Sequence, residues 1–461
     1  MISNEPLQYG VTVVPLPIHR RSFLKTAGAS TATFTILQAG SARTYAANEK
    51  LNIACIGAGG RGALNVRDTG SQNIIVLCDV DWKRAAESFK KLPNAKRYKD
   101  YRVMLSEMDS KIDAVTVSTP DHHHFHASMA AIQLGKHVYC EKPLTHSIWE
   151  ARELTKAARE AGVATQMGNQ AQADKETRIV QEFVIDNAVG PIRESHIWTD
   201  RPSRGLFSEY WPQGVSRPTD TPAIPETMSW DLWIGPAPMR PYHPTYAPFK
   251  WRGRWDFGTG ALGDMGCHYF DPVVRALKLK APTSVEAVST RVNEESYPLG
   301  SVVTYHFPAR GEMPPVKVVW YDGGLRPPRP DALKDGDELG ANGVMLVGDD
   351  GVILSDWDDW RMFPENRAKE YGTPPKVLAR SPGHHEEWIQ ACKGGPKAGA
   401  NFDFAGPLTE TVLLGNVALR SQLRDDLTQK KLLWDSDKME FTNHESANQF
   451  LRREYRDGWQ V

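Results

Sequence analysis

Cysteine is scarce in this sequence, with five residues among 461, and no two of them form a C-x-x-C pair. Three of the five, Cys55, Cys78 and Cys140, lie inside apolar runs typical of strands. A thiol in such a run behaves as a small hydrophobic side chain. We therefore expect no framework of disulfide bonds to hold the fold together.

An excess of charge of one sign and long apolar runs are also missing. The formal net charge is −1 at pH 7, so the composition favours neither nucleic acid nor an anionic membrane as a partner. The apolar stretch near the N-terminus is too short and too polar to span a bilayer. With 40% hydrophobic and 24% charged residues, the chain fits a soluble globular protein of two or three domains, with no membrane anchor.

The N-terminal segment 1–46 resembles a twin-arginine export signal. Arg20 and Arg21 precede Phe23, Leu24 and Lys25, and a weakly apolar run rich in Ala, Thr and Gly follows. Small residues in "TYAA" predict cleavage after residue 46. The resemblance implies a periplasmic or secreted protein that is exported folded, with the twin-arginine translocase as its partner during export. A disordered basic arm is the alternative.

A glycine-rich turn follows the first apolar strand, which is predicted over 51–56. In "GAGGRG", Gly57 permits a tight turn, Gly59 lets a pyrophosphate approach the backbone, and Gly62 lets the following helix pack on the strand. The strand before and the helix after make this fingerprint more specific than the glycines alone. The predicted cofactor contacts in this turn are Gly57, Gly59, Gly60, Arg61 and Gly62.

A second strand, "NIIVLCDVD", ends at Asp79, 22 residues after Gly57. An acid at this place accepts hydrogen bonds from the adenosine ribose, so it favours NAD and repels the extra phosphate of NADP. Lys83 and Arg84 lie close by and keep NADP open. A carboxylate that merely caps a helix is the alternative interpretation.

Strand and helix patterns then alternate up to residue 170, which predicts an α/β fold with a doubly wound parallel sheet. Ligands of such sheets bind at the carboxyl ends of the strands. We therefore expect the residues that follow the predicted strands to meet in one crevice; they are Thr119, Pro120, Glu141, Lys142, Pro143 and Asn169.

Four motifs together resemble the glucose–fructose oxidoreductase / inositol dehydrogenase / rhizopine-catabolism (Gfo/Idh/MocA) family over roughly residues 50–440. They are the glycine fingerprint, "STPDHHHFH", "GKHVYCEKPL" and "GALGDMGCHYFD". The resemblance implies a Rossmann domain followed by an α+β domain with an open-faced, mostly antiparallel sheet, which often forms the interface of a homo-oligomer. It also implies that a late helical pattern returns toward the nucleotide domain.

The domain boundaries that follow from these patterns are a Rossmann domain over 47–170, a C-terminal α/β domain for substrate and oligomerisation over 171–440, and a C-terminal tail over 441–461. Within the second domain, 201–255 is rich in Pro, Trp and Tyr. Linkers rarely carry so many aromatic residues, so we expect an ordered loop that covers the site.

Asp264 and His268 lie four residues apart, which places them on one face of a helix. The family resemblance places both with Lys142 over the nicotinamide, where the three would be catalytic. His268 is suited to accept the hydroxyl proton, Lys142 to stabilise negative charge or share the proton, and Asp264 to orient the imidazole or bind a neighbouring hydroxyl. Whether Lys142 or His268 is the formal base stays open.

The histidines of "DHHHFH" add one further candidate, because His124 matches the family histidine after Thr119-Pro120. His122, His123 and His126 are expected at the surface or behind the site. A metal site built on Asp264, His268 and these histidines is the rival interpretation, but a dinucleotide already occupies the crevice, so no metal is expected. A second rival interpretation is that Asp264 only caps a helix and His268 only packs in the core.

The function predicted from these residues is an NAD(P)-dependent oxidoreductase that transfers hydride at a secondary alcohol of a sugar, cyclitol or related polyol. Free NAD is scarce outside the cytoplasm, so an exported enzyme should hold its cofactor tightly. The alternatives are an NAD-dependent glycosidase that oxidises C3 transiently before elimination, and a cofactor-binding scaffold without activity. Substrate contacts are expected within 201–255, for example at Trp251 and Arg252.

Overall fold

The computed structural model describes residues 49–203, 209–333, 338–355, 359–424 and 426–460. The proposed export signal at 1–46 lies outside them. Within the described residues, no helix combines the length and the apolar character needed to cross a membrane. All five cysteines are buried as free thiols.

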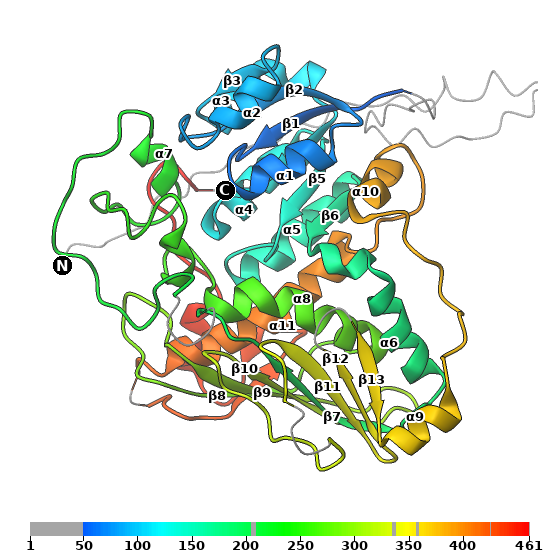
Figure 1. Cartoon of the computed structure of the whole chain (residues 1–461). Coiled ribbons are helices and arrows are strands. Elements are labelled where there is room, and N and C mark those ends of the chain that lie inside the picture. The colour runs from blue at the N-terminus through cyan, green and yellow to red at the C-terminus, as the bar shows by residue number, and fades with distance from the viewer. Residues whose placement is uncertain (1–48, 204–208, 334–337, 356–358, 425, 461) are drawn as a thin grey trace, which may run out of the picture. The chain divides into compact units, whose positions relative to one another are not determined.

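A six-stranded parallel sheet forms the first half of the fold, in the order β3-β2-β1-β4-β5-β6 (Figure 1). Its register places Ile53 beside Ile74 and beside Ala114, so the central strand β1 is buried between two neighbours. The strands are β1 (Asn52–Ile56), β2 (Asn73–Cys78), β3 (Lys96–Tyr98), β4 (Ala114–Val117), β5 (His137–Glu141) and β6 (Thr165–Gly168), and the helices are α1 (Arg61–Asp68), α2 (Ala86–Lys91), α3 (Tyr101–Met108), α4 (His124–Gln133) and α5 (Ile148–Ala161).

Local sequence explains the helix boundaries of this half. α5 begins at a capping box, in which the Ser147 side chain accepts from the Glu150 amide and the Glu150 carboxylate accepts from the Ser147 amide. It ends at Gly162, whose φ of 65° is left-handed and suits a residue without Cβ. Apolar residues of α5 at helical spacing, among them Ile148, Ala151 and Leu154, are buried against the sheet and its neighbours.

A nine-stranded sheet forms the second half, in the order β13-β12-β11-β7-β10-β9-β8-β14-β15. All its pairs are antiparallel except β10 with β7. The strands are β7 (Ile192–Trp198), β8 (Ser284–Ser289), β9 (Ser301–Phe307), β10 (Val316–Tyr321), β11 (Gly343–Gly348), β12 (Val352–Ser355), β13 (Trp360–Phe363), β14 (Leu432–Asp435) and β15 (Glu440–Phe441). The predicted fold class, a Rossmann sheet followed by a mostly antiparallel one, is confirmed.

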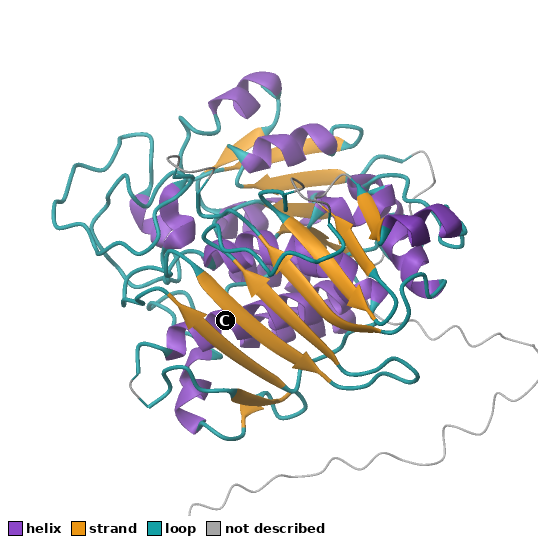
Figure 2. Ribbon diagram, turned by 60° about the horizontal axis from the view of Figure 1, so that its bottom comes forward, coloured by secondary structure: helices purple, strands orange, loops and turns teal. Residues whose placement is uncertain are grey.

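Helices gather behind one face of this larger sheet (Figure 2). Inward residues of the sheet pack against α8, where the Phe270 ring lies 5.4 Å from Tyr305 and 6.1 Å from Trp320. α11 packs against α8 and also against α5 of the first half, as the expected returning helix does. The helices are α6 (Lys175–Ile185), α7 (Trp230–Ile234), α8 (Gly260–Ala276), α9 (Glu365–Tyr371), α10 (His384–Cys392) and α11 (Phe402–Ser421).

Two segments without a regular sheet complete the fold around the first half. The described part of 201–255 has a buried core of its own, which includes Trp230, Trp233 and Tyr246. The residues after 440, expected as a tail, contain β15 and a short 3-10 helix (Glu445–Phe450), and they end on a buried Trp459. Both segments contact the Rossmann half, where the Ser229 amide donates to the Val80 carbonyl at 2.9 Å and the His126 ring contacts the Trp459 carbonyl at 2.9 Å.

Candidate active site

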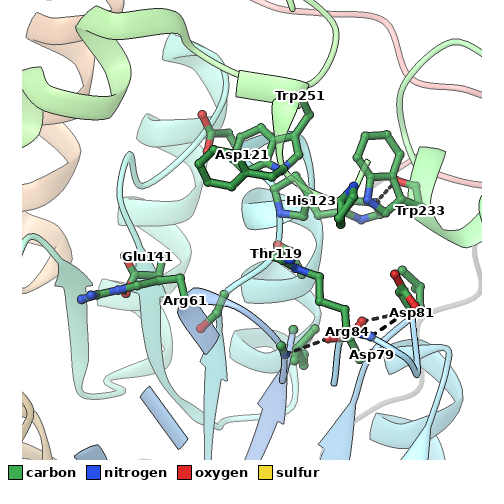
Figure 3. A pocket seen from close by; sticks show the side chains of 18 of the residues that line it. Arg61, Asp79, Asp81, Arg84, Thr119, Asp121, His123, Glu141, Trp233 and Trp251 are labelled. Carbon is green, nitrogen blue, oxygen red and sulfur yellow. Dashed lines mark hydrogen bonds and ion pairs between the residues drawn. The ribbon is translucent and has the colours of Figure 1, made fainter. Parts of the chain in front are cut away.

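A pocket of about 480 Å³ opens at the carboxyl ends of β1, β2, β4 and β5. Figure 3 shows Asp79 on one side of it and Trp233 and Trp251 on another, with Arg84 extending from the Asp79 side into the pocket. Eight of the predicted cofactor contacts line it: Gly57, Gly59, Arg61, Asp79, Thr119, Pro120, Glu141 and Lys142. Asp264, His268, Trp251 and Arg252 line it as well.

The glycine turn forms one wall of the pocket with bare backbone. Gly57 has a φ of 78°, and a Cβ there would lie 2.6 Å from the carbonyl oxygen of Ser118. A Cβ on Gly62 would overlap the Gly57 carbonyl, so α1 can approach the turn only because position 62 is glycine. Gly60 lies against the Arg84 side chain. Neither Gly60 nor Gly62 lines the pocket; the turn exposes Gly57 and Gly59 to it.

Asp79 joins this turn to the end of β2. Its Oδ2 accepts from the Gly59 amide at 3.0 Å, and its Oδ1 accepts from the Asp81 amide at 2.9 Å. Burial raises the pKa of the carboxyl to about 6, against the effect of these two amides. Arg84 lines the same wall, whereas Lys83 does not.

The residues present fit a dinucleotide. The turn presents the bare backbone of Gly57 and Gly59 to the pocket, Asp79 lies beside the turn, and the buried hydroxyl of Thr119 at the pocket has no hydrogen-bond partner among the described residues. A buried hydroxyl without a partner is costly unless a ligand or water satisfies it. Within the described residues, no group of three or more His, Cys, Asp or Glu is placed to hold a metal ion.

Glu141 is the centre of a buried polar cluster on the inner side of the pocket. Its Oε1 accepts from Arg61 at 3.0 Å, from Asn65 at 2.9 Å and from Gln170 at 3.1 Å. Burial by itself would raise the pKa of this carboxyl, but Arg61 and Asn65 hold it below its usual value. Glu141 is therefore an anion that fixes Arg61 and the start of α1 at the pocket.

The next residue, Lys142, points away from the Glu141 cluster and contacts Asp264 on α8. Its Nζ donates to Asp264 twice, to the Oδ1 atom at 2.5 Å and to the backbone oxygen at 2.8 Å. Arg252 Nε lies 3.1 Å from the same Oδ1. Burial would raise the pKa of Asp264, but Arg252 and Lys142 lower it far below its usual range. Asp264 thus carries a permanent negative charge between two cations.

A second carboxylate extends this ion-pair cluster. Arg252 also contacts Asp121 at 3.3 Å, and Asp121 accepts from the Thr259 hydroxyl at 2.6 Å, next to the start of α8. Asp121 is 1% exposed. Sequence reasoning did not select Asp121, although its position directly after Thr119-Pro120 places it at the same strand end.

His268 lies one helical turn after Asp264 on α8, and both line the pocket. The prediction that the two side chains share one face of a helix is therefore confirmed. Burial lowers the pKa of the imidazole to about 3, and the nearby Lys142 charge acts in the same direction. His268 is neutral at physiological pH, so one ring nitrogen can accept a proton.

Two segments of the chain match models of one protein family. Residues 51–169 match the model described as "Oxidoreductase family, NAD-binding Rossmann fold", and residues 207–307 match "Oxidoreductase family, C-terminal alpha/beta domain". Both are models of the Gfo/Idh/MocA oxidoreductase family, so these two segments are similar to its two domains. The first domain of this chain is accordingly an NAD-binding Rossmann domain.

Relatives within this group carry names of carbohydrate enzymes. A 1,5-anhydro-D-fructose reductase of Ensifer adhaerens is 39% identical over 82 residues, which are 18% of this chain and 25% of the relative. A levoglucosan dehydrogenase of Pseudarthrobacter phenanthrenivorans is 22% identical over 196 residues, 42% of this chain and 40% of the relative. The chain thus matches between a quarter and two fifths of the length of these relatives.

Solved structures share the fold. GenD2 from gentamicin A biosynthesis, in complex with NAD, superposes with a TM-score of 0.57 at 17% identity, covering 86% of this chain and 99% of GenD2. At this identity the likeness shows the fold and not the reaction.

Two predicted cofactor contacts lie behind the pocket instead of lining it. Asn169 is fully buried, and its Nδ2 donates to Asp271 on α8 at 2.7 Å. His124 is also buried, and its ring nitrogens contact the carbonyl oxygens of Pro143 at 2.7 Å and Thr119 at 2.9 Å. His124 therefore ties together two loops that do line the pocket.

His122, His123 and His126, expected at the surface or behind the site, are all in the interior. All three are at most 5% exposed. His122 and His123 each contact the carbonyl oxygen of Trp233, at 3.0 and 2.9 Å, and His126 contacts that of Trp459 at 2.9 Å. Segments far along the chain bury these rings, and His123 itself lines the pocket.

Replacing Asp79 by serine tests its place in the Rossmann domain. Loss of a charged acceptor beside the glycine turn should weaken NADH binding about tenfold and narrow the preference over NADPH. Fluorescence titration with both nucleotides measures this. Lys83→Ala, beside the pocket but outside its lining, is the control and should bind as the wild type does; an unchanged NADH affinity in Asp79→Ser would contradict the assignment.

Proposed function

We propose that this protein is an NAD(P)-dependent oxidoreductase that transfers hydride at a secondary alcohol carbon of a sugar, cyclitol or related polyol. The observation that carries the proposal is the convergence of Lys142, Asp264 and His268 in the pocket that also contains the glycine turn and Asp79. A bound nicotinamide supplies a hydride acceptor there. The similarity of two segments to the domains of an oxidoreductase family supports the same reaction class.

The three side chains divide the work of handling the hydroxyl proton. Burial keeps His268 neutral by lowering its pKa, which also makes the imidazole a weak base, so it can take the hydroxyl proton only together with hydride transfer from the carbinol. The Lys142 ammonium has three donors, and Asp264 uses two of them. The third is available to the substrate oxygen, where a positive charge stabilises the developing alkoxide. Asp264 fixes the position of that ammonium.

The charge balance of the site favours a neutral substrate. Lys142 and Arg252 carry two positive charges, which Asp264 and Asp121 offset. Arg201, a further cation of the lining, is paired with Asp200 at 2.5 Å. Aromatic side chains supply the rest of this wall, namely Tyr210, Phe249 and Trp251. Flat apolar surfaces with a few fixed polar groups suit the alternating C–H and O–H faces of a polyol.

Kinetics of two variants test these roles. His268→Ala and Lys142→Met should each lower kcat/KM by about 10²–10⁴-fold, the usual loss when a proton acceptor or a charge stabiliser is removed. Dinucleotide binding should change far less than kcat/KM, because the glycine turn and Asp79 are intact in both variants. Initial rates of NADH formation on a panel of sugars and cyclitols give the values, and Lys83→Ala is the matched control.

The pH profile tests whether His268 is neutral throughout the working range of pH. Since the pKa of His268 is lowered to about 3, the neutral imidazole persists as pH falls, and kcat/KM should show no His268 limb between pH 5 and 8. An acidic limb near pH 6.5 that vanishes in His268→Ala would contradict a buried, neutral His268.

The alternative function, an NAD-dependent glycosidase, has its own test. Release of nitrophenol from a chromogenic glycoside without net NADH would identify a glycosidase.

We also propose export through the twin-arginine pathway. The support is the sequence of residues 20–25, which lie outside the described part of the chain. Replacing both Arg20 and Arg21 by lysine keeps the charge, and most of the protein should then stay in the cytoplasmic fraction. Cell fractionation with an antibody measures this, and Arg43→Lys is the control. Periplasmic or secreted protein from the double variant would rule the pathway out.

A homo-oligomer built on the larger sheet is the last part of this proposal. Val288, Val302 and Tyr321 lie side by side across β8, β9 and β10 on the face away from α8 and α11, and Val288 is 55% exposed. The substitution Val288→Asp would bury an unpaired charge in the interface, so it should raise the dissociation constant of the oligomer at least about tenfold. Light scattering against concentration measures it. A wild type that is monomeric at all concentrations would refute this part.

A further inference from the structure

Residues 451–460, called here the C-terminal segment, return to the Rossmann domain and complete the pocket wall. Trp459 is 6% exposed and lines the pocket, together with Tyr101 and His123 of the Rossmann domain and Leu232 and Trp233 of α7. Neither family model covers this segment, since they match residues 51–169 and 207–307. Trp459 is therefore the one of these five wall residues that lies outside both matched segments.

A buried carboxylate on α5 anchors the beginning of the segment. Glu150 is fully buried, and its Oε1 accepts from Arg453 Nε and from the Tyr455 hydroxyl, both at 2.8 Å. Arg453 also donates to the carbonyl oxygen of His122 at 2.5 Å. Breaking such a buried pair leaves an uncompensated charge, so this anchor holds the chain firmly.

A second anchor joins the segment to the 201–255 insert. Arg456 donates to the Asp231 carboxylate at 2.6 Å and to the carbonyl oxygen of Gly235 at 3.0 Å, so it holds both ends of α7. The insert is itself fixed to the loop after β2, because the Ser229 amide donates to the Val80 carbonyl at 2.9 Å. The segment, α7 and the Asp79 loop are thus one connected structure.

Trp459 is held from three directions. The His126 ring donates to its carbonyl oxygen at 2.9 Å, the Arg102 guanidinium lies 4.1 Å from the ring centroid, and the His123 ring meets it edge-on at 5.5 Å. A tryptophan with so many contacts is a fixed part of the wall. The Tyr101 ring lies 6.3 Å from the Trp459 ring, and Tyr101, Asp79 and Val80 line the same pocket.

Aromatic rings beside a ribose-binding carboxylate suit a flat heterocycle attached to that ribose. Resting on the proposed NAD(P) function, we propose that the C-terminal segment is part of the cofactor site, with Trp459 closing the end that receives the adenine. Because Trp459 is tied to α5 and α7, the dinucleotide can leave by this end only when the segment is displaced. The anchors at Glu150 and Asp231 then set the rate of release.

Dissociation of NADH from the full-length protein tests this. Trp459→Ala and Arg456→Ala should each release bound NADH about tenfold faster, since changes within one interface act mostly on the dissociation rate. Trp459→Phe, which keeps an aromatic ring, should stay near the wild-type rate. Arg452→Ala is the matched control, because Arg452 belongs to the segment but stacks on Trp149 away from the pocket. Loss of NADH fluorescence on mixing with excess NAD gives the rates.

Thermal unfolding of the cofactor-free variants separates a cofactor role from a purely structural one. If Trp459→Ala and Arg456→Ala melt earlier but release NADH at the wild-type rate, the segment only supports the fold and the proposal is overturned. Should Trp459→Ala fail to fold, Arg456→Ala decides alone, as it leaves the ring in place. If the wild type binds no dinucleotide, the proposed function is overturned as well. If the wild type binds dinucleotide and the variants release NADH at the wild-type rate, only this inference is overturned.

Discussion

The site depends on one buried carboxylate, Asp264. A carboxylate removed from water is costly unless cations and hydrogen bonds compensate it, and here the cations come from two distant segments. Lys142 follows a strand of the Rossmann sheet, and Arg252 lies in the insert. Asp264 itself sits on α8, which packs on the larger sheet. Satisfying this single charge therefore brings the nucleotide domain, the insert and the second domain to the same point.

The adjacent pair Glu141-Lys142 shows how a strand end can serve both domains. Neighbouring residues of an extended chain point in opposite directions. Glu141 accordingly joins Arg61, Asn65 and Gln170 within the Rossmann domain, while Lys142 reaches α8. One residue fixes the turn that receives the cofactor, and the next places a cation where the substrate oxygen would lie. Because Glu141 and Lys142 are adjacent, the position of the cofactor turn and the position of the catalytic cation are directly linked.

Features that depend on neighbouring residues are predictable from the sequence. The glycine turn, Asp79 and the strand-end residues Glu141 and Lys142 follow local patterns, as does the shared face of Asp264 and His268. Asn169 shows where such reasoning stops. It does follow a strand, but its amide finds a partner in Asp271, about a hundred residues later, and turns away from the pocket. A position at a strand end predicts where a residue lies, but the direction of its side chain depends on which hydrogen-bond partner the fold supplies.

Burial by distant segments is the other limit. Nothing in "DHHHFH" shows that Trp233 and Trp459 will cover its rings, so a polar run that resembles a surface lies in the interior. The insert was recognisable because it concentrates aromatic residues. Residues 451–460 contain only isolated aromatic and arginine residues, which predict no structure by themselves. Their position depends on ion pairs with Glu150 on α5 and Asp231 on α7, which no sequence pattern predicts.

The wall beside Asp79 also has a consequence for synthesis of the chain. Its members are separated by several hundred residues, from the loop after β2 through α7 to Trp459. The ribosome therefore completes a parallel sheet with an open nucleotide cleft long before it supplies the tryptophan that bounds it. Contacts of such large sequence separation form late and slowly. A nascent Rossmann domain could exchange dinucleotide freely, and the same cleft would become a closed compartment only after translation has passed the entire second domain.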